Sequence, residues 1–234
     1  KTRMLILCSP SNPTGSVYSK DELEALAEVI KKHEGLYVLA DEIYEHINYI
    51  GKHESIAQFE GMKERSIIVN GVSKAYAMTG WRIGFIAAPQ WIVKGCNKLQ
   101  GQYTSGPCSV SQKAAEAAYT LPQDCVETMR QAFERRRDLI VSLAKEIPGL
   151  EVNKPEGAFY LFPKCSSFFG KTDGQRTINN STDFAMYLLE VGHVATVGGD
   201  AFGDPDCFRM SYATSDDNIK EAMSRIKNAL SLLK

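Results

Sequence analysis

Short runs of apolar residues, each ending in polar or turn-forming residues, organise the first part of the chain. Three such runs cover residues 3–10, 36–44 and 66–74. Because they lack the alternation of a half-exposed strand, they are typical of strands buried on both faces of a parallel sheet. Between the first two runs the period is helical, with a possible capping box formed by Ser19 and Glu22. Strand, helix and strand in this order predict parallel βαβ units with helices on both faces of the sheet.

The pattern becomes helical after residue 90 and mixed after residue 148. A helical stretch over 90–119 is interrupted at TSGPCS, and one long amphipathic helix is expected over 123–147. The later expected elements are two short strands within 150–164, a helix over 181–192, strands over 193–199 and 206–213, and a closing helix over 215–233. We therefore expect an α/β domain over 1–148, which includes the long helix, and a smaller α+β domain over 149–234.

Charge and cysteine content narrow the class of protein. The chain has 27 basic and 28 acidic side chains, a net charge of -1, so it has no basic field for binding nucleic acid. No apolar run is long enough to cross a membrane, and residues 1–10 do not resemble a signal peptide. The six cysteines have neither disulfide-framework nor zinc-site spacing, which indicates a reducing, cytoplasmic compartment.

Polar side chains follow each of the three buried strands. Asn12 comes after the first, Asp41 and Tyr44 after the second, and Ser73 and Lys74 after the third. Ligands of parallel α/β sheets bind beyond the carboxyl ends of the strands, so we expect these side chains to converge at one edge. Taken singly, each has an ordinary interpretation: a solvated lysine, a capping aspartate, a turn-forming asparagine or a packed tyrosine.

Together with Arg82, which glycines flank, these residue types suit the chemistry of one cofactor. A lysine amine can form an imine with an aldehyde, and a carboxylate can keep a pyridine nitrogen protonated. Tyrosine and asparagine can hydrogen-bond a phenolic oxygen, and arginine can bind a phosphate through a forked, charge-assisted contact. The combination indicates a site for pyridoxal 5'-phosphate.

Five motifs carry a resemblance to a known family. In chain order they are SNPTG, DEIY, GVSKAYAMTGWRIG, GAFYLF and FRMSYA, and together they extend to residue 213. The set resembles the fold type I, class I aminotransferases, which depend on pyridoxal phosphate, and in particular the bacterial aspartate aminotransferase subgroup. The resemblance implies part of the large-domain, mostly parallel sheet with flanking helices, followed by a C-terminal α+β small domain.

The resemblance also implies roles for the residues that bind the cofactor. Lys74 would hold it as an internal aldimine and then move the proton between the substrate's α-carbon and the cofactor. Asp41 would pair with the pyridine nitrogen, and Tyr44 and Asn12 would contact the phenolic oxygen.

Further roles concern the phosphate and the substrate. Arg82, with Ser73, would bind the phosphate, and Arg209 in FRMSYA would bind the substrate's α-carboxylate in a bidentate contact. The family often has a serine three residues before the lysine as another phosphate ligand. This chain has Gly71 at that position, so that contact is open.

The expected function is amino-group transfer between an amino acid, with aspartate favoured, and a 2-oxo acid, with 2-oxoglutarate favoured. The resemblance implies that the sequence is the C-terminal part of a longer, homodimeric enzyme. Two alternatives remain open: a β-eliminating lyase that uses the same fold and cofactor, and an aminotransferase-like effector domain of a transcription regulator.

Overall fold

The computed structural model describes all residues from Lys1 to Lys234 and contains two compact units. Unit 1 consists of residues 1–11 and 16–130, and unit 2 consists of residues 12–15 and 131–234. The division at residue 130 lies inside the long helix. The expected domain boundary at residue 148 stays a prediction, because it concerns the domains of an intact enzyme.

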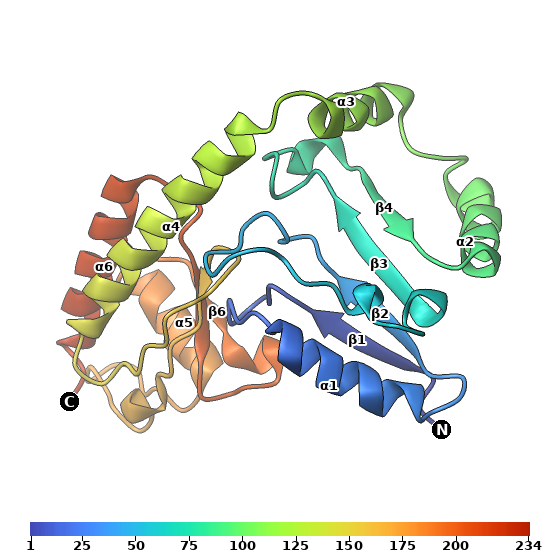
Figure 1. Cartoon of the computed structure of the whole chain (residues 1–234). Helices are drawn as coiled ribbons and strands as arrows, with labels where there is room; N and C mark the ends of the chain where they lie inside the picture. Colours follow the sequence, from blue (N-terminus) through green and yellow to red (C-terminus); the bar gives the residue numbers. More distant parts are fainter. The chain divides into compact units, whose positions relative to one another are not determined.

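Unit 1 is built on a four-stranded sheet with strand order β1-β2-β3-β4. The first three strands are parallel and β4 is antiparallel to β3, as the arrows in Figure 1 show. The strands are β1 (Met4–Cys8), β2 (Tyr37–Asp41), β3 (Ser66–Gly71) and β4 (Gly84–Ala87). The mostly parallel α/β sheet expected from the apolar runs is confirmed.

Helix α1 (Lys20–Lys31) connects β1 to β2 and covers one face of the sheet. Ser19 caps its start, and the reciprocal contacts with Glu22 complete the predicted capping box. The apolar side of α1 joins inward-facing strand residues in a core made of Leu7, Leu23, Ala27, Ile30, Val38, Ala40, Ile56 and Met62.

Beyond the sheet and α1, unit 1 contains further helices joined by turns and loops. The predicted break at TSGPCS is present, and it separates two helices; a long third helix continues into unit 2. The short 3₁₀ helices, labelled η, are η1 (Ile56–Gln58), η2 (Lys63–Arg65) and η3 (Thr79–Trp81). The α-helices are α2 (Gln90–Tyr103), α3 (Ser109–Thr120) and α4 (Asp124–Lys145).

Unit 2 combines helices with a small antiparallel sheet of order β5-β7-β6. Its elements are β5 (Tyr160–Leu161), η4 (Ser166–Phe168), α5 (Ser181–Glu190), β6 (Val197–Gly198), η5 (Gly199–Phe202), β7 (Phe208–Ser211) and α6 (Asp216–Leu230). The first of the two strands expected within 150–164 is reduced to one bridge between Glu151 and Lys164. Pro155 interrupts that stretch, and proline cannot donate to a strand ladder.

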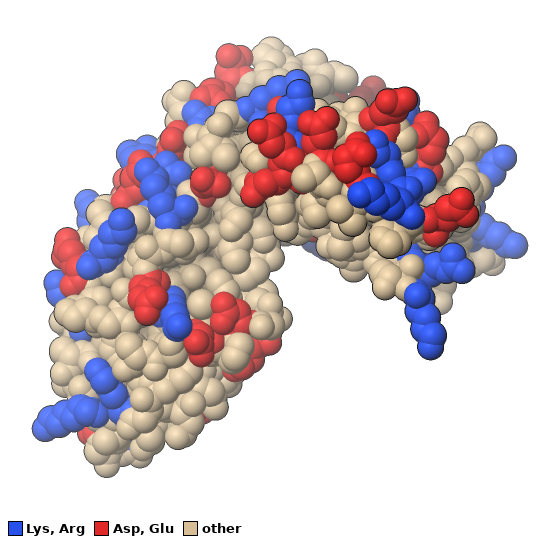
Figure 2. All heavy atoms as spheres, turned by 60° about the horizontal axis from the view of Figure 1, so that its bottom comes forward, with Lys and Arg blue, Asp and Glu red and all other residues tan.

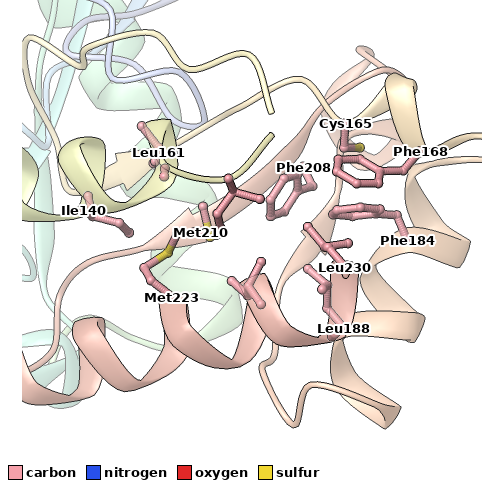
Figure 3. Close-up of a cluster of buried hydrophobic side chains, with 14 of the residues drawn as sticks. Ile140, Leu161, Cys165, Phe168, Phe184, Leu188, Phe208, Met210, Met223 and Leu230 are labelled. Carbon is pink, nitrogen blue, oxygen red and sulfur yellow. The ribbon is translucent and has the colours of Figure 1, made fainter. Parts of the chain in front are cut away.

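The core of unit 2 gathers side chains from α4, α5, α6 and the small sheet, as Figure 3 shows. The ring of Phe184 on α5 lies 5.5 Å from that of Phe168 and 4.8 Å from that of Phe208, measured between centroids. Leu188, one turn further along α5, is fully buried. Because these contacts join elements distant in the sequence, they hold β7 in place between the helices.

Lys and Arg side chains are interspersed with Asp and Glu over the face drawn in Figure 2. This view agrees with the near-neutral composition. None of the helices combines the length and the apolar character that crossing a bilayer requires.

Two adjacent leucines of α5 provide a matched test of the unit 2 core. Leu188 is 0 % exposed and Leu189 is 44 % exposed. We expect Leu188→Ala to lower the free energy of unfolding by about 2–5 kcal/mol, because it leaves a cavity in a packed core. Leu189→Ala should change it by about 0.5 kcal/mol or less. Denaturant unfolding monitored by circular dichroism measures both, and equal effects would contradict the described packing.

Candidate functional site

The ends of the sheet strands in unit 1 bring five of the seven sequence-predicted residues to one edge. Cys8 of β1 pairs with Asp41 of β2, and Asp41 pairs with Val69 of β3, so β1 and β2 end at the same level and β3 extends two residues further. Lys74 follows the end of β3. Since β4 runs back from this edge, Arg82, two residues before β4 begins, is at the same edge. The convergence expected from parallel strands is therefore present in unit 1 for Asp41, Tyr44, Ser73 and Lys74, and Arg82 lies at the same edge.

A tight turn after β2 positions Asp41 and Tyr44. The Oδ1 atom of Asp41 accepts a hydrogen bond of 3.2 Å from the backbone N–H of Ile43, which fixes the carboxylate relative to the turn. Tyr44 is 3 % exposed, and the Nζ atom of Lys74 lies 5.9 Å from the centroid of its ring. An amine, a phenol ring and a carboxylate thus share the end of two neighbouring strands.

The segment after Lys74 returns towards the sheet through η3. Thr79 donates a 2.9 Å hydrogen bond from its hydroxyl to the carbonyl oxygen of Ser73 and accepts one of 3.0 Å from the Nη1 atom of Arg82 at its own carbonyl. Arg82 has a left-handed backbone, with φ of 51°, which is uncommon for a residue other than glycine. This conformation ends η3 and leads the chain directly into β4.

Gly71 and Gly84, which pair at the ends of β3 and β4, approach each other too closely for side chains. A Cβ atom built on Gly71 would lie 2.8 Å from the Cα atom of Gly84 and 2.9 Å from the carbonyl oxygen of Ile83. The serine that the resembled family often has at this position therefore does not fit here without a backbone shift. The close approach of the two backbones thus explains why this chain has glycine at position 71, where the family often has a serine that contacts the phosphate.

Glu45 adds a negative charge beside the turn that carries Tyr44. Burial by itself raises the pKa of Glu45, but hydrogen bonds from His46 and Asn70, with the charges of His46 and His53, outweigh it and lower the pKa below its usual value. The nearest nitrogen of His46 lies 3.2 Å from the carboxylate. The carboxylate of Glu45 is consequently ionised at neutral pH.

The other two sequence-predicted residues meet in unit 2. The Nη1 atom of Arg209 on β7 donates a 2.7 Å hydrogen bond to the Oδ1 atom of Asn12, 197 positions away in the sequence. The carbonyl oxygen of Gly15 anchors the Asn12 turn by accepting 2.9 Å hydrogen bonds from the backbone of Glu156 and Gly157. This pairing of an amide with a distant guanidinium was not expected from the sequence.

Two aromatic residues near Arg209 were also missed. The Cζ atom of Arg209 lies 4.5 Å from the ring centroid of Tyr160 and 4.8 Å from that of Phe202. Tyr160 lies within the GAFYLF motif. That motif indicated the family but did not indicate a contact between Tyr160 and Arg209. Nothing in the local sequence around Phe202 indicates an arginine contact.

Comparison with known proteins identifies the family. The family model described as aminotransferase class I and II matches residues 1–226. The chain belongs to the class I and II aminotransferases. The resemblance to fold type I, pyridoxal-phosphate-dependent class I aminotransferases is thereby confirmed, and so is the predicted fold class.

Several individual relatives are similar over nearly the whole chain. A bifunctional aspartate aminotransferase and glutamate/aspartate-prephenate aminotransferase of Petunia hybrida is 51% identical over 239 residues, which cover 100% of this chain and 50% of that protein. An aspartate aminotransferase of Rhizobium meliloti (strain 1021) is 48% identical over 232 residues, covering 98% of this chain and 57% of the relative.

Solved structures agree with these matches. The aspartate aminotransferase from Rhizobium meliloti has a TM-score of 0.95 and 47% identity, with 100% of this chain and 59% of that one covered. The aromatic aminotransferase from Pyrococcus horikoshii OT3 has a TM-score of 0.89 and 42% identity, covering 98% and 60% respectively. This chain spans about half the length of the curated relatives from Petunia and Pinus pinaster that it matches.

The contact between β3 and β4 can be tested with two glycines of the same segment. We expect Gly71→Ser to lower the free energy of unfolding by about 1–3 kcal/mol, because the new Cβ meets the backbone of Gly84. Gly80→Ser is the control, since no atom lies within 4 Å of its added Cβ, and it should change stability by about 0.5 kcal/mol or less. Thermal unfolding of both variants measures this difference; a Gly71→Ser protein as stable as the control would refute the close approach.

Proposed function

We propose that the intact protein is an aminotransferase that moves an amino group between an amino acid and a 2-oxo acid, with pyridoxal 5'-phosphate as cofactor. The observation that carries this proposal is the placement of Lys74 at the carboxyl edge of the unit 1 sheet, with its amine 5.9 Å from the ring of Tyr44, in a chain of this family. Aspartate and 2-oxoglutarate are the proposed pair, because relatives that are about half identical are named aspartate aminotransferases.

The donor set in unit 1 fits the cofactor. It offers an amine for the aldehyde, a carboxylate for the pyridine nitrogen, a phenol for the phenolic oxygen and a guanidinium for the phosphate. When bound, pyridoxal phosphate supplies an aldehyde that takes up the amino group and a ring that accepts electrons from the substrate's α-carbon.

Lys74 has two proposed tasks. Its amine would attach the cofactor covalently and, once free, would move the proton between the substrate's α-carbon and the cofactor. The Asp41 carboxylate, oriented by its bond from the Ile43 N–H, keeps the pyridine nitrogen protonated. The family resemblance implies that Tyr44 and Asn12 would hydrogen-bond the phenolic oxygen.

Arg82 and Ser73 are the proposed phosphate ligands. Arg82 is exposed, and its guanidinium donates one hydrogen bond to the Thr79 carbonyl, so donors remain for a phosphate. Gly71 has no side chain that could contact the phosphate. The positive charge opposite the phosphate would therefore come mainly from Arg82.

Arg209 is the proposed ligand of the substrate's α-carboxylate. Every other arginine of unit 2 pairs with an aspartate or glutamate, namely Arg135, Arg136, Arg137, Arg176 and Arg225. Arg209 has an amide oxygen and two rings around it, so its positive charge is not neutralised within the unit. A carboxylate of the substrate would complete that environment through a bidentate contact.

We also propose a cytoplasmic location for the intact protein. The six cysteines form no disulfide, which is usual in a reducing compartment. Homodimer formation by the intact enzyme stays a prediction from the family resemblance.

Covalent attachment gives the first test. We expect the intact protein, incubated with pyridoxal phosphate and reduced with borohydride, to carry the cofactor on Lys74, as mapped by peptide mass spectrometry. Lys74→Ala should abolish the labelled peptide, whereas Lys63→Ala, which removes an exposed lysine of the same unit, should leave it unchanged. Labelling spread over several lysines would contradict a dedicated attachment site.

Product analysis gives the second test. With aspartate and 2-oxoglutarate we expect oxaloacetate and glutamate, and we expect Lys74→Ala to lower turnover at least about a hundredfold, since it removes the proton-transfer group. Chromatography of the products measures this. If the protein instead releases ammonia and pyruvate from an amino acid that carries a leaving group on its β-carbon, such as a cysteine thioether, and forms no glutamate from aspartate and 2-oxoglutarate, it is a β-eliminating lyase.

A further inference from the structure

Arg209 has a neighbourhood in which its direction is controlled without a competing negative charge. Its Cζ atom lies 4.5 Å from the ring centroid of Tyr160 and 4.8 Å from that of Phe202, and its one side-chain hydrogen bond goes to the amide oxygen of Asn12. No aspartate or glutamate forms an ion pair with it, in contrast to the other arginines of unit 2. The rings therefore take the place that a carboxylate occupies around the other arginines.

Both rings are held by the surrounding fold. Tyr160 is 7 % exposed and lies on β5, where it pairs with Ser211 of β7, two residues beyond Arg209. Phe202 is the last residue of η5. Its ring packs edge-on against the ring of Phe162, with 5.9 Å between the ring centroids. A left-handed glycine, Gly203, follows at once and turns the chain away, with φ of 83°.

Ring contacts of this kind affect binding in two ways. The face of an aromatic ring attracts a guanidinium, so it restricts the rotation of a long, flexible side chain. A ring cannot neutralise the positive charge as a carboxylate does, and it also excludes water from one side of the group. A guanidinium fixed in this way can present two parallel N–H donors to an incoming carboxylate with less loss of conformational freedom on binding.

We infer that Tyr160 and Phe202 are positioning residues that orient Arg209 for bidentate binding of the substrate's α-carboxylate. The inference rests on the proposed function, because it assigns the carboxylate to Arg209. It predicts that the two rings act on carboxylate affinity through Arg209 and have no part in proton transfer at the α-carbon.

The test uses the intact protein with its cofactor and the unreactive dicarboxylate maleate as probe. We expect Phe202→Leu and Tyr160→Leu each to weaken maleate binding by about 3- to 30-fold, the range that a lost cation–π contact gives. The KM for the amino acid should rise by a similar factor, with kcat changed less than KM. The conservative variants Phe202→Tyr and Tyr160→Phe keep a ring, so they should retain an affinity for maleate within about twofold of that of the unmodified protein. Isothermal titration calorimetry and steady-state kinetics measure these quantities.

Ile178→Ala is the control for a purely structural effect. It truncates a fully buried side chain of the unit 2 core in the segment before α5, outside the strands of the small sheet. We expect it to lower the melting temperature and to leave maleate affinity of the folded protein unchanged. Phe202 is only half-buried, so Phe202→Leu keeps the inference testable if Tyr160→Leu does not fold.

The outcomes separate this inference from the proposed function. If Arg209→Lys abolishes maleate binding while both leucine variants bind as tightly as the unmodified protein, the positioning role is wrong and the carboxylate role of Arg209 stands. If kcat falls and KM stays constant in the leucine variants, the rings act on another step and the inference is also wrong. If the unmodified protein forms no keto acid from any amino acid and does not bind maleate, the proposed function itself fails.

Discussion

The parallel pairing of β1, β2 and β3 is the constraint on which the chemistry of unit 1 depends. Parallel strands end at one edge, so Asp41 and Lys74 come to the same edge although 33 positions separate them in the numbering. The antiparallel return of β4 then brings Arg82 to that edge as well. This return requires the backbones of Gly71 and Gly84 to approach within a distance that admits no side chain. The spacing between lysine and arginine in GVSKAYAMTGWRIG is thus the length of chain needed to leave β3, form η3 and enter β4.

In unit 2 the main constraint concerns Arg209, whose guanidinium is held in one orientation while no carboxylate neutralises its positive charge. Arg209 projects from β7, a strand fixed on one side by the aromatic core around Phe184 and Phe208 and paired with β5 and β6. Around it the protein supplies rings and one amide oxygen in place of a carboxylate. An arginine paired with an internal carboxylate would have to lose that partner before it could bind a substrate, which costs free energy. The rings avoid this competition.

Much of this arrangement could be predicted from the sequence, for identifiable reasons. The buried strands and the helix capped by Ser19 follow from local patterns, and strand parallelism alone was sufficient to predict that Asp41 and Lys74 share an edge. The contact between Asn12 and Arg209 could not be predicted, because it joins residues 197 positions apart and no local pattern encodes such a pairing. The same holds for Phe202, which is an ordinary phenylalanine until the fold brings it to the guanidinium. The strand expected near residue 151 is reduced to one bridge, because Pro155 interrupts the apolar pattern and cannot donate to a strand ladder.

The two sets of residues differ in how strictly the fold fixes them. Lys74 lies in a short irregular segment whose geometry is set at both ends, by β3 on one side and by the left-handed Arg82 on the other. Few alternatives are open to such a segment, so a substitution that moves β4 would move the lysine as well. Arg209 lies on a regular strand, and its backbone position is secured by strand pairing and by the core packing of β7. Its long side chain retains freedom that the strand cannot remove, and the neighbouring rings supply the missing restriction. The position of Lys74, the proposed catalytic amine, is thus constrained through its backbone, and Arg209, the proposed carboxylate ligand, is constrained mainly through its side-chain neighbours.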